Sequence, residues 1–140
     1  MTDTSTAISA RGLTKLFGRE TGVEEISFEV PRGKILGFIG PSGSGKTTTV
    51  RLLAGIYRPS AGDVTVLGCR PRHFSQRLRR KIGYMPQQFA LYPELTVWEN
   101  MNFAASIYGM RANRKTQLRQ ALEFVQLSDD KRKLARNLSG

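Results

Sequence analysis

The segment GPSGSGKT, residues 40–47, brings together three glycines, a lysine and a threonine. Glycine can adopt a positive φ and lets the backbone come close to a ligand, so that successive N–H groups point toward one anion. The amine of Lys46 would place a positive charge on the outer phosphates of a nucleotide, and the hydroxyl of Thr47 can ligate Mg²⁺. The order G-x-x-x-x-G-K-[ST] therefore predicts a phosphate-binding loop; the alternative is a glycine-rich turn with an incidental lysine.

Such a loop needs a strand before it and a helix after it. The run KILGFIG, residues 34–40, is almost continuously apolar, which is typical of a strand buried on both faces. The preceding run EEISFEV, residues 24–30, alternates apolar and polar positions and predicts a half-buried strand. Two more short strands are predicted from GDVTVLG, residues 62–68, and from IGYM, residues 82–85.

Three segments have the spacing of amphipathic helices. The first follows the loop and stops at Pro59, and its apolar positions are Val50, Leu52, Leu53 and Ile56. Thr96 and Glu99 predict a capping box before a second helix that ends near Gly109. Asn113 is the expected cap of a third helix, whose shared face would carry Leu118, Leu122 and Val125. Strands therefore dominate the first half of the chain and helices the last third.

The composition is that of one ordinary globular domain, with 140 residues and 39% hydrophobic residues. The single cysteine, Cys69, can form no internal disulfide, and the polar N-terminus has no apolar core of a signal peptide. The net charge is +11, and the densest basic run is RPRHFSQRLRRK, residues 70–81, which includes the only histidine, His73. Such a charge suggests nucleic acid or an anionic membrane surface as a partner. The alternatives are a solvated surface for the basic run and a missing acidic part of a larger protein for the net charge.

Four motifs in one order resemble the ATP-binding domain of ABC transporters, from Ile8 to Gly140. They are LTKLFG before the loop, YRPSAGDVTVLG after the helix that follows the loop, IGYMPQQFALYPELTVWEN with a Q-loop, and NLSG at the start of a signature motif. The sequence of the segment ALYPELTVWENMNFAASIYGM most resembles exporters of the multidrug and daunorubicin-resistance type. The resemblance implies an α/β P-loop NTPase fold: an antiparallel β subdomain, the P-loop strand and helix, and a helical subdomain over about residues 96–140. It also implies a flexible segment over residues 1–7.

The resemblance further implies that ATP and Mg²⁺ are the cofactors. The residues that match nucleotide-binding positions are Phe17, Val23, Gly40, Pro41, Ser42, Gly43, Ser44, Gly45, Lys46, Thr47 and Thr48. Phe17 would stack on adenine, unless it is a core phenylalanine, and Val23 would contact the base. Gln87 would reach Mg²⁺ and the attacking water, so Gln87 and Lys46 are the expected catalytic residues and Thr47 and Gln87 the expected metal contacts. The adjacent glutamine, Gln88, is the alternative for that role.

The expected partners are a membrane-spanning transporter subunit and a second ATP-binding domain, with no nucleic acid. Ser139 and Gly140 would contact the ATP held by that second domain. The membrane subunit would dock near Phe89, Leu91 and Tyr92, unless these side chains belong to the core. The implied function is that of the energy-coupling subunit of an exporter, peripheral to the cytoplasmic face of the cell membrane.

Two other classes remain as alternatives. A P-loop kinase or GTPase would lack the Q-loop and the LSG motif. A non-transport ABC ATPase that acts on ribosomes or nucleic acid would suit the positive charge.

The ABC domain continues beyond its signature into a Walker B aspartate, a catalytic glutamate, a D-loop and a switch histidine. The nearest substitute is LEFVQLSDD, residues 122–130, in which Gln126 and Ser128 interrupt the apolar run. We therefore interpret Gly140 as a cut within an incomplete domain, residues 1–140, and expect these residues alone not to hydrolyse ATP.

Overall fold

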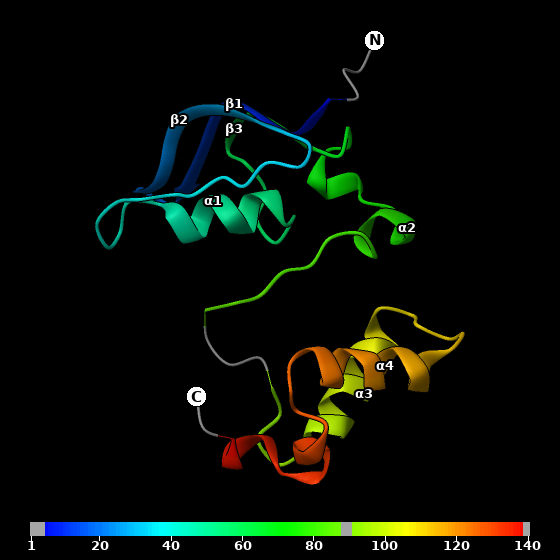
Figure 1. Cartoon of the computed structure of the whole chain (residues 1–140). Helices are drawn as coiled ribbons and strands as arrows, with labels where there is room; N and C mark the ends of the chain where they lie inside the picture. The colour runs from blue at the N-terminus through cyan, green and yellow to red at the C-terminus, as the bar shows by residue number, and fades with distance from the viewer. Residues whose placement is uncertain (1–4, 88–90, 139–140) are drawn as a thin grey trace. The chain divides into compact units, whose positions relative to one another are not determined.

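The structure is a computed structural model that describes residues 5–87 and 91–138. The chain divides into two compact units, Met1–Ile82 and Gly83–Gly140. Within the described residues, the first unit holds the β-sheet and the second holds the two longest helices, as the colours in Figure 1 show.

The first unit contains an antiparallel sheet of three strands, in the order β2-β1-β3. The strands are β1 (Thr6–Phe17), β2 (Glu20–Pro31) and β3 (Ala61–Val66). Ala10 of the central strand lies opposite Phe28 of β2 and Val64 of β3. The alternation predicted for residues 24–30 and the strand predicted for residues 62–68 are confirmed.

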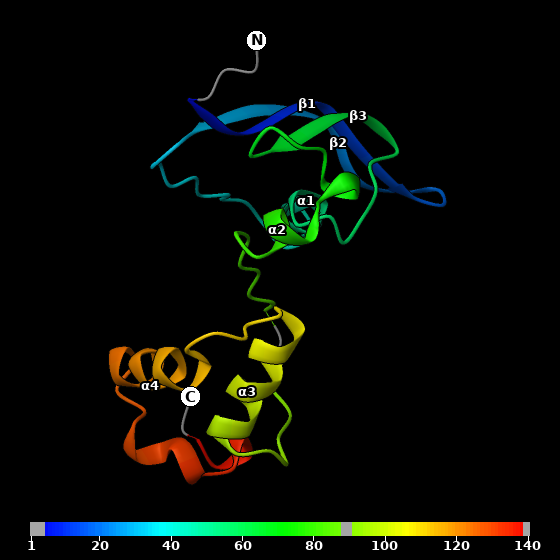
Figure 2. The same ribbon diagram turned by 90° about the vertical axis from the view of Figure 1, so that its right-hand side faces the viewer.

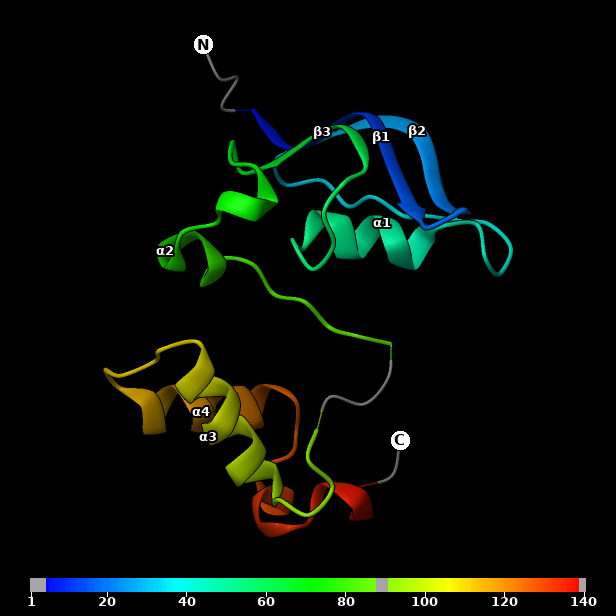
Figure 3. The ribbon, with the colours of Figure 1, turned by 180° about the vertical axis from the view of Figure 1, so that it is seen from behind.

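Helix α1 (Lys46–Leu53) covers one face of this sheet, as Figures 1 and 3 show. The core between them consists of Ala10, Leu13, Leu52 and Val64, with Ile26, Phe28, Leu53 and Tyr57 packed against it. Leu13 and Leu52 are fully buried, and burial of each such side chain stabilises the fold by roughly 1.5–3 kcal/mol. The helix that follows the glycine-rich loop is thereby fixed to the sheet.

Helix α1 is shorter than the sequence predicts. It ends at Leu53, and Gly55 follows with a φ of 74°. The N–H of Gly55 donates to Leu52 O and the N–H of Ile56 donates to Arg51 O, which is the pairing of a Schellman motif. Ile56 therefore lies beyond the helix and is exposed, and Val50 is also exposed.

The strand predictions for residues 34–40 and 82–85 are wrong for this chain. Both segments are irregular, and Ile35 and Ile39 are fully exposed. A strand needs the backbone groups of a neighbouring strand. Among residues 5–87 and 91–138, the sheet consists of β1, β2 and β3, and no strand pairs with either segment.

Two short elements complete the first unit, a 3₁₀ turn (Pro71–His73) and helix α2 (Gln76–Arg79). Pro71 and Phe74 are buried. The basic side chains of residues 70–81 are exposed, as is His73, which agrees with the prediction of a solvated surface.

The second unit is built on helices α3 (Val97–Ile107) and α4 (Arg114–Phe124). Figure 2 shows them in a view turned by 90° from that of Figure 1. The predicted capping box of α3 is present: Thr96 Oγ1 accepts from the N–H of Glu99, and the N–H of Thr96 donates to Glu99 Oε2 at 2.8 Å. The bonds from the backbone N–H of Thr96 and from its hydroxyl lower the pKa of Glu99 below its ordinary value. The carboxylate therefore caps α3 throughout the neutral pH range.

Helix α4 departs from its prediction at both ends. Asn113 precedes the helix, but its φ is 53° and its side chain makes no capping bond, since an N-cap side chain reaches the first turn from extended backbone. Leu118 and Leu122 are buried as predicted, whereas Val125 lies beyond the helix and is exposed. The residue after it, Gln126, has a φ of 57°, which ends the helical path.

A buried asparagine organises the chain before α3. Asn100 Oδ1 accepts from the N–H of Tyr92 at 2.7 Å, and Asn100 Nδ2 donates to the carbonyls of Tyr92 and Leu95 at 3.0 and 3.1 Å. Two 3₁₀ turns, Asp129–Arg132 and Ala135–Asn137, follow α4. Between them, Leu134 forms an isolated antiparallel β-bridge with Thr96, the residue before α3.

The sequence predicts a flexible N-terminal segment over residues 1–7. Residues 1–4 lie outside the described residues. Thr6 and Ala7 belong to β1, where the carbonyl of Ala7 accepts from the N–H of Leu67 at 2.7 Å.

Candidate functional site

The glycine-rich loop, Gly40 to Thr47, leads directly into α1. Gly43 and Gly45 have φ values of 83° and 85°, a region that glycine occupies without steric strain. Gly45 is also held tightly: a Cβ there would lie 2.5 Å from the carbonyl oxygen of Gly22 and 2.9 Å from a methyl group of Val23. The loop therefore presses against β2 where only a glycine fits.

The N-terminus of α1 has unpaired donors that face the loop region. Gly45 is the N-cap and offers no side chain, and the first turn holds no acidic residue. The first helical bond runs from the N–H of Thr49 to Gly45 O at 2.8 Å, which leaves the earlier N–H groups of the helix without an intrahelical acceptor. These donors and the positive end of the helix dipole favour the binding of an anion at this end of α1.

The side chain of Lys46 lies back across the loop. Its Nζ donates to the carbonyls of Gly40 at 2.7 Å and Pro41 at 2.6 Å, and to Ser44 Oγ at 3.2 Å. An ammonium group has three donors, so these acceptors match them one for one. A phosphate that takes this position would have to exchange some of those bonds for its own.

A magnesium ion fits the loop in one respect. Thr47 is exposed, and its hydroxyl makes no hydrogen bond with another described residue. Among the described residues, no three or more His, Cys, Asp or Glu side chains are clustered for a metal. Mg²⁺ keeps several waters and binds through a few protein oxygens together with substrate phosphates, so the Thr47 hydroxyl suffices as the loop's own ligand.

Phe17 lies at the end of β1 and remains 42% exposed. Its ring meets the ring of Tyr57 edge-on, with the centroids 5.2 Å apart, and Lys15 Nζ lies 5.1 Å from the Phe17 centroid. A Cβ on Gly22 would lie 2.7 Å from the ring. Phe17 is thus outside the buried core, and neighbours on several sides hold its ring.

Val23 occupies a different environment from the one its expected role suggests. It is buried, with only 7% of its surface exposed, and it packs on Gly45 of the loop. Its direct contact is with the loop backbone, and contact with a base remains a prediction.

The remaining site residues belong to the second unit. Gln87 is described and exposed. Gln88, Ser139 and Gly140 lie outside the described residues, so the structure does not test their predicted roles.

Two features of this site were missed from the sequence. One is the set of loop oxygens that hold Lys46, and the other is the contact of Tyr57 with Phe17. Tyr57 carries no motif signal, because the contact joins positions that are 40 residues apart in the chain.

The fold and the loop define a P-loop nucleotide-binding protein. Residues 23–140 match the family model described as ABC transporter. One relative, "Probable multidrug ABC transporter ATP-binding protein YbhF" of Escherichia coli (strain K12), is 39% identical over 112 residues, which are 80% of this chain and 19% of that protein. A second from the same strain, "Fe(3+) ions import ATP-binding protein FbpC", is 34% identical over 134 residues, which are 95% and 38% of the two chains.

A solved structure described as "Structure of ATP binding subunit of ABC transporter" superposes with a TM-score of 0.80 at 28% identity. The match covers 96% of this chain and 56% of that one. This chain belongs to the ABC transporter family, and its fold is the N-terminal portion of an α/β ABC ATPase domain, as the sequence predicted. It spans less than two thirds of the length of each of these three proteins.

Replacement of Gly45 tests the fit of the loop against β2. We expect Gly45→Ala to distort the loop, because the added Cβ would overlap the Gly22 carbonyl and the backbone has a left-handed φ. Binding of Mg·ATP, measured by titration calorimetry, should be lost. Gly37→Ala is the matched control, since a Cβ there has no atom within 4 Å and should leave binding unchanged. Unaltered binding by Gly45→Ala would contradict the loop geometry.

Proposed function

We propose that this chain binds Mg·ATP through residues 40–48 and serves as the energy-coupling subunit of an ABC transporter. The observation that carries this proposal is the loop itself, with positive-φ glycines, free N–H donors at the start of α1 and the Lys46 ammonium beside them. The family membership supports the assignment to transport, in preference to an ABC ATPase that acts on ribosomes or nucleic acid.

In this proposal each loop group acts on a defined part of the nucleotide. The N–H groups of Gly43 to Thr48 donate to phosphate oxygens, and Lys46 turns from the loop carbonyls toward the outer phosphates. The Thr47 hydroxyl would hold Mg²⁺, and the ion would supply charge neutralisation at the phosphates when the γ-phosphoryl group passes to water. Gln87 orients that water, and Ser139 and Gly140 contact the ATP of a second, opposed domain. Hydrolysis of ATP in the complete transporter then drives the transport cycle.

Export is the direction we propose. The segment ALYPELTVWENMNFAASIYGM, residues 90–110, supports it, because its sequence resembles those of multidrug and daunorubicin-resistance exporters. The name of FbpC describes import, so membership of the family leaves the direction open and the export proposal rests on that segment.

Replacement of Lys46 tests nucleotide binding. A charge-assisted hydrogen bond contributes roughly 1.5–3 kcal/mol, so Lys46→Ala should weaken Mg·ATP binding about 10- to 150-fold. We expect a loss of affinity near tenfold, the lower end of this range, because Lys46 gives up its hydrogen bonds to Gly40 and Pro41 when it turns to a phosphate. Titration calorimetry measures the affinity, and Lys34→Ala, at an exposed lysine outside the loop, is the control. Equal affinities for Lys46→Ala and the unmodified chain would refute the assignment.

Phe17 is proposed as the platform for adenine. Phe17→Ala should weaken ATP binding by roughly 1–3 kcal/mol, by analogy with nucleobases that stack on aromatic side chains. Phe17→Tyr should be nearly neutral, since stacking needs the ring and not the hydroxyl. The affinity of each variant for ATP is measured by displacement of a fluorescent ATP analogue. Tripolyphosphate, which has no base, should bind both variants equally. If Phe17→Ala binds ATP as tightly as the unmodified chain, the residue does not contact the base.

The proposed partner surface consists of Leu91, Tyr92 and Phe103 in the second unit. Leu91 is 47% and Tyr92 is 50% exposed, and the rings of Tyr92 and Phe103 meet edge-on at 4.9 Å. These side chains are therefore not core residues, and Phe89 lies outside the described residues. The buried amide of Asn100 holds the backbone of Tyr92, so the surface is presented in a fixed conformation.

We propose that this surface receives a cytoplasmic helix of a membrane-spanning subunit, which would hold the protein at the cytoplasmic face of the membrane. In the described residues no helix combines the length and the apolar character that crossing a bilayer requires. With Cys69→Ser as background, Ala90→Cys in the transporter in native membranes should crosslink to a membrane-spanning subunit. Thr116→Cys, on the exposed side of α4, is the control and should not. Crosslinks from Ala90→Cys to soluble proteins alone would contradict the proposal.

A further inference from the structure

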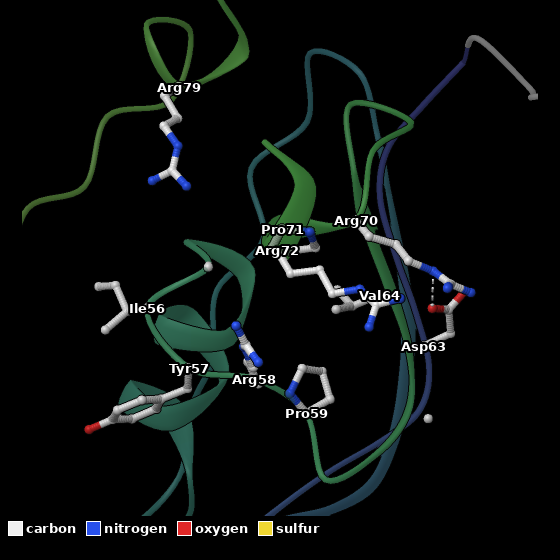
Figure 4. A pocket seen from close by; sticks show the side chains of 12 residues that line it. Ile56, Tyr57, Arg58, Pro59, Asp63, Val64, Arg70, Pro71, Arg72 and Arg79 are labelled. Atoms are coloured by element: carbon white, nitrogen blue, oxygen red, sulfur yellow. Dashed lines mark ion pairs between the residues drawn. The ribbon is translucent and has the colours of Figure 1, made fainter. Parts of the chain in front are cut away.

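The first unit contains a hollow of about 420 Å³ that shares no residue with the phosphate loop. It lies between the segment after α1, strand β3 and the 3₁₀ turn, as Figure 4 shows. This volume is within the range of sites for small molecules, about 300–1,000 Å³. Arg58, Arg70, Arg72 and Arg79 line it, and among the described residues Asp63 is its only acidic lining residue.

Only one of these arginines is neutralised by a carboxylate. Arg70 Nε pairs with Asp63 Oδ1 at 2.9 Å. Arg79 uses its Nε on the carbonyl of Phe74 at 3.2 Å, a contact that leaves its charge uncompensated. Arg58 and Arg72 make no hydrogen bond or ion pair with another described residue. A guanidinium group stays protonated, so the hollow has three positive charges in excess.

Backbone packing brings these side chains to one place. A Cβ on Gly55 would lie 3.0 Å from the carbonyl oxygen of Pro71, so the end of α1 is pressed against the 3₁₀ turn. Arg58 follows Gly55 by three residues, and Arg72 follows Pro71 directly. In Figure 4, Arg58 and Arg79 extend into the hollow from opposite sides. The backbone contact thus holds the segment that carries Arg58 against the turn that carries Arg72.

We propose that this arginine hollow, defined by Arg58, Arg72 and Arg79, binds a phosphate-bearing anion at a site separate from the phosphate loop. Planar guanidinium groups donate pairs of hydrogen bonds to phosphate oxygens, and an anion here would relieve the repulsion among the three side chains. The phosphate comes either from a free polyphosphate or from the headgroup of an anionic lipid.

The test uses the 140-residue chain with Lys46→Ala, which weakens the phosphate loop as a competing site. Inorganic tripolyphosphate is titrated by calorimetry, and vesicles of phosphatidylcholine with phosphatidylglycerol are compared with vesicles of phosphatidylcholine alone in a flotation assay. We expect binding of at least one of the two phosphate probes. In the same background, Arg72→Gln should weaken that binding about tenfold or more.

Arg77→Gln is the matched control, because it removes one positive charge from the same basic run but does not line the hollow. It should change affinity by no more than about twofold, since charges at the surface are screened by salt. Arg72 and Arg77 are both exposed, so both variants should melt at the temperature of the Lys46→Ala chain. Equal melting temperatures of all three show that neither substitution acts by unfolding the chain.

Binding of tripolyphosphate that depends on Arg72 supports a free polyphosphate as the source. Retention on phosphatidylglycerol vesicles that depends on Arg72 supports a lipid headgroup. Equal losses for Arg72→Gln and Arg77→Gln would show attraction by net charge alone and overturn the proposal. Failure of the Lys46→Ala chain to bind either probe would overturn it as well.

Discussion

Burial of Leu52 against the sheet of the first unit is the interaction on which the rest of that unit depends. Leu52 is fully buried with Leu13, Ala10 and Val64, and it lies two turns into the helix that begins at Lys46. This packing fixes the axis of α1, and so fixes the direction in which its first N–H groups point. At the start of the same helix, the close contact between Gly45 and the backbone of β2 holds the end of the loop against the sheet.

The loop is thereby organised before any ligand arrives. A flexible loop would lose conformational entropy on binding, roughly 1–2 kcal/mol for each residue fixed. Here Gly43 and Gly45 already have positive φ, and Lys46 already bonds back to Gly40, Pro41 and Ser44 of the loop. Binding then requires mainly the exchange of Lys46 partners, which is a smaller change than ordering the loop.

Local signals in the sequence predicted local structure well. The capping box of Thr96 and Glu99, the alternation along β2 and the loop motif each depend on residues close together in the chain, and all three are present. Residues 34–40 show the limit: an apolar run describes a strand that could be buried, but a strand forms only beside another strand. The contacts of Phe17 with Tyr57 and of Gly45 with Gly22 join distant positions, and no pattern in one sequence signals them.

In the proposed function the two units contribute different groups to one cycle. Lys46 belongs to the first unit, whereas Gln87 and the surface of Leu91, Tyr92 and Phe103 belong to the second. Gln87 lies five positions after Ile82, where the first unit ends.

The central claim, that the loop at the start of α1 is the nucleotide site, is tested most directly by backbone amide NMR during addition of Mg·ATP. The account predicts that the amide resonances of Gly43 to Thr48 shift most strongly and saturate together, since these N–H groups would become donors to phosphate. Saturable binding that leaves those resonances in place, and shifts only the resonances of other segments, would contradict it.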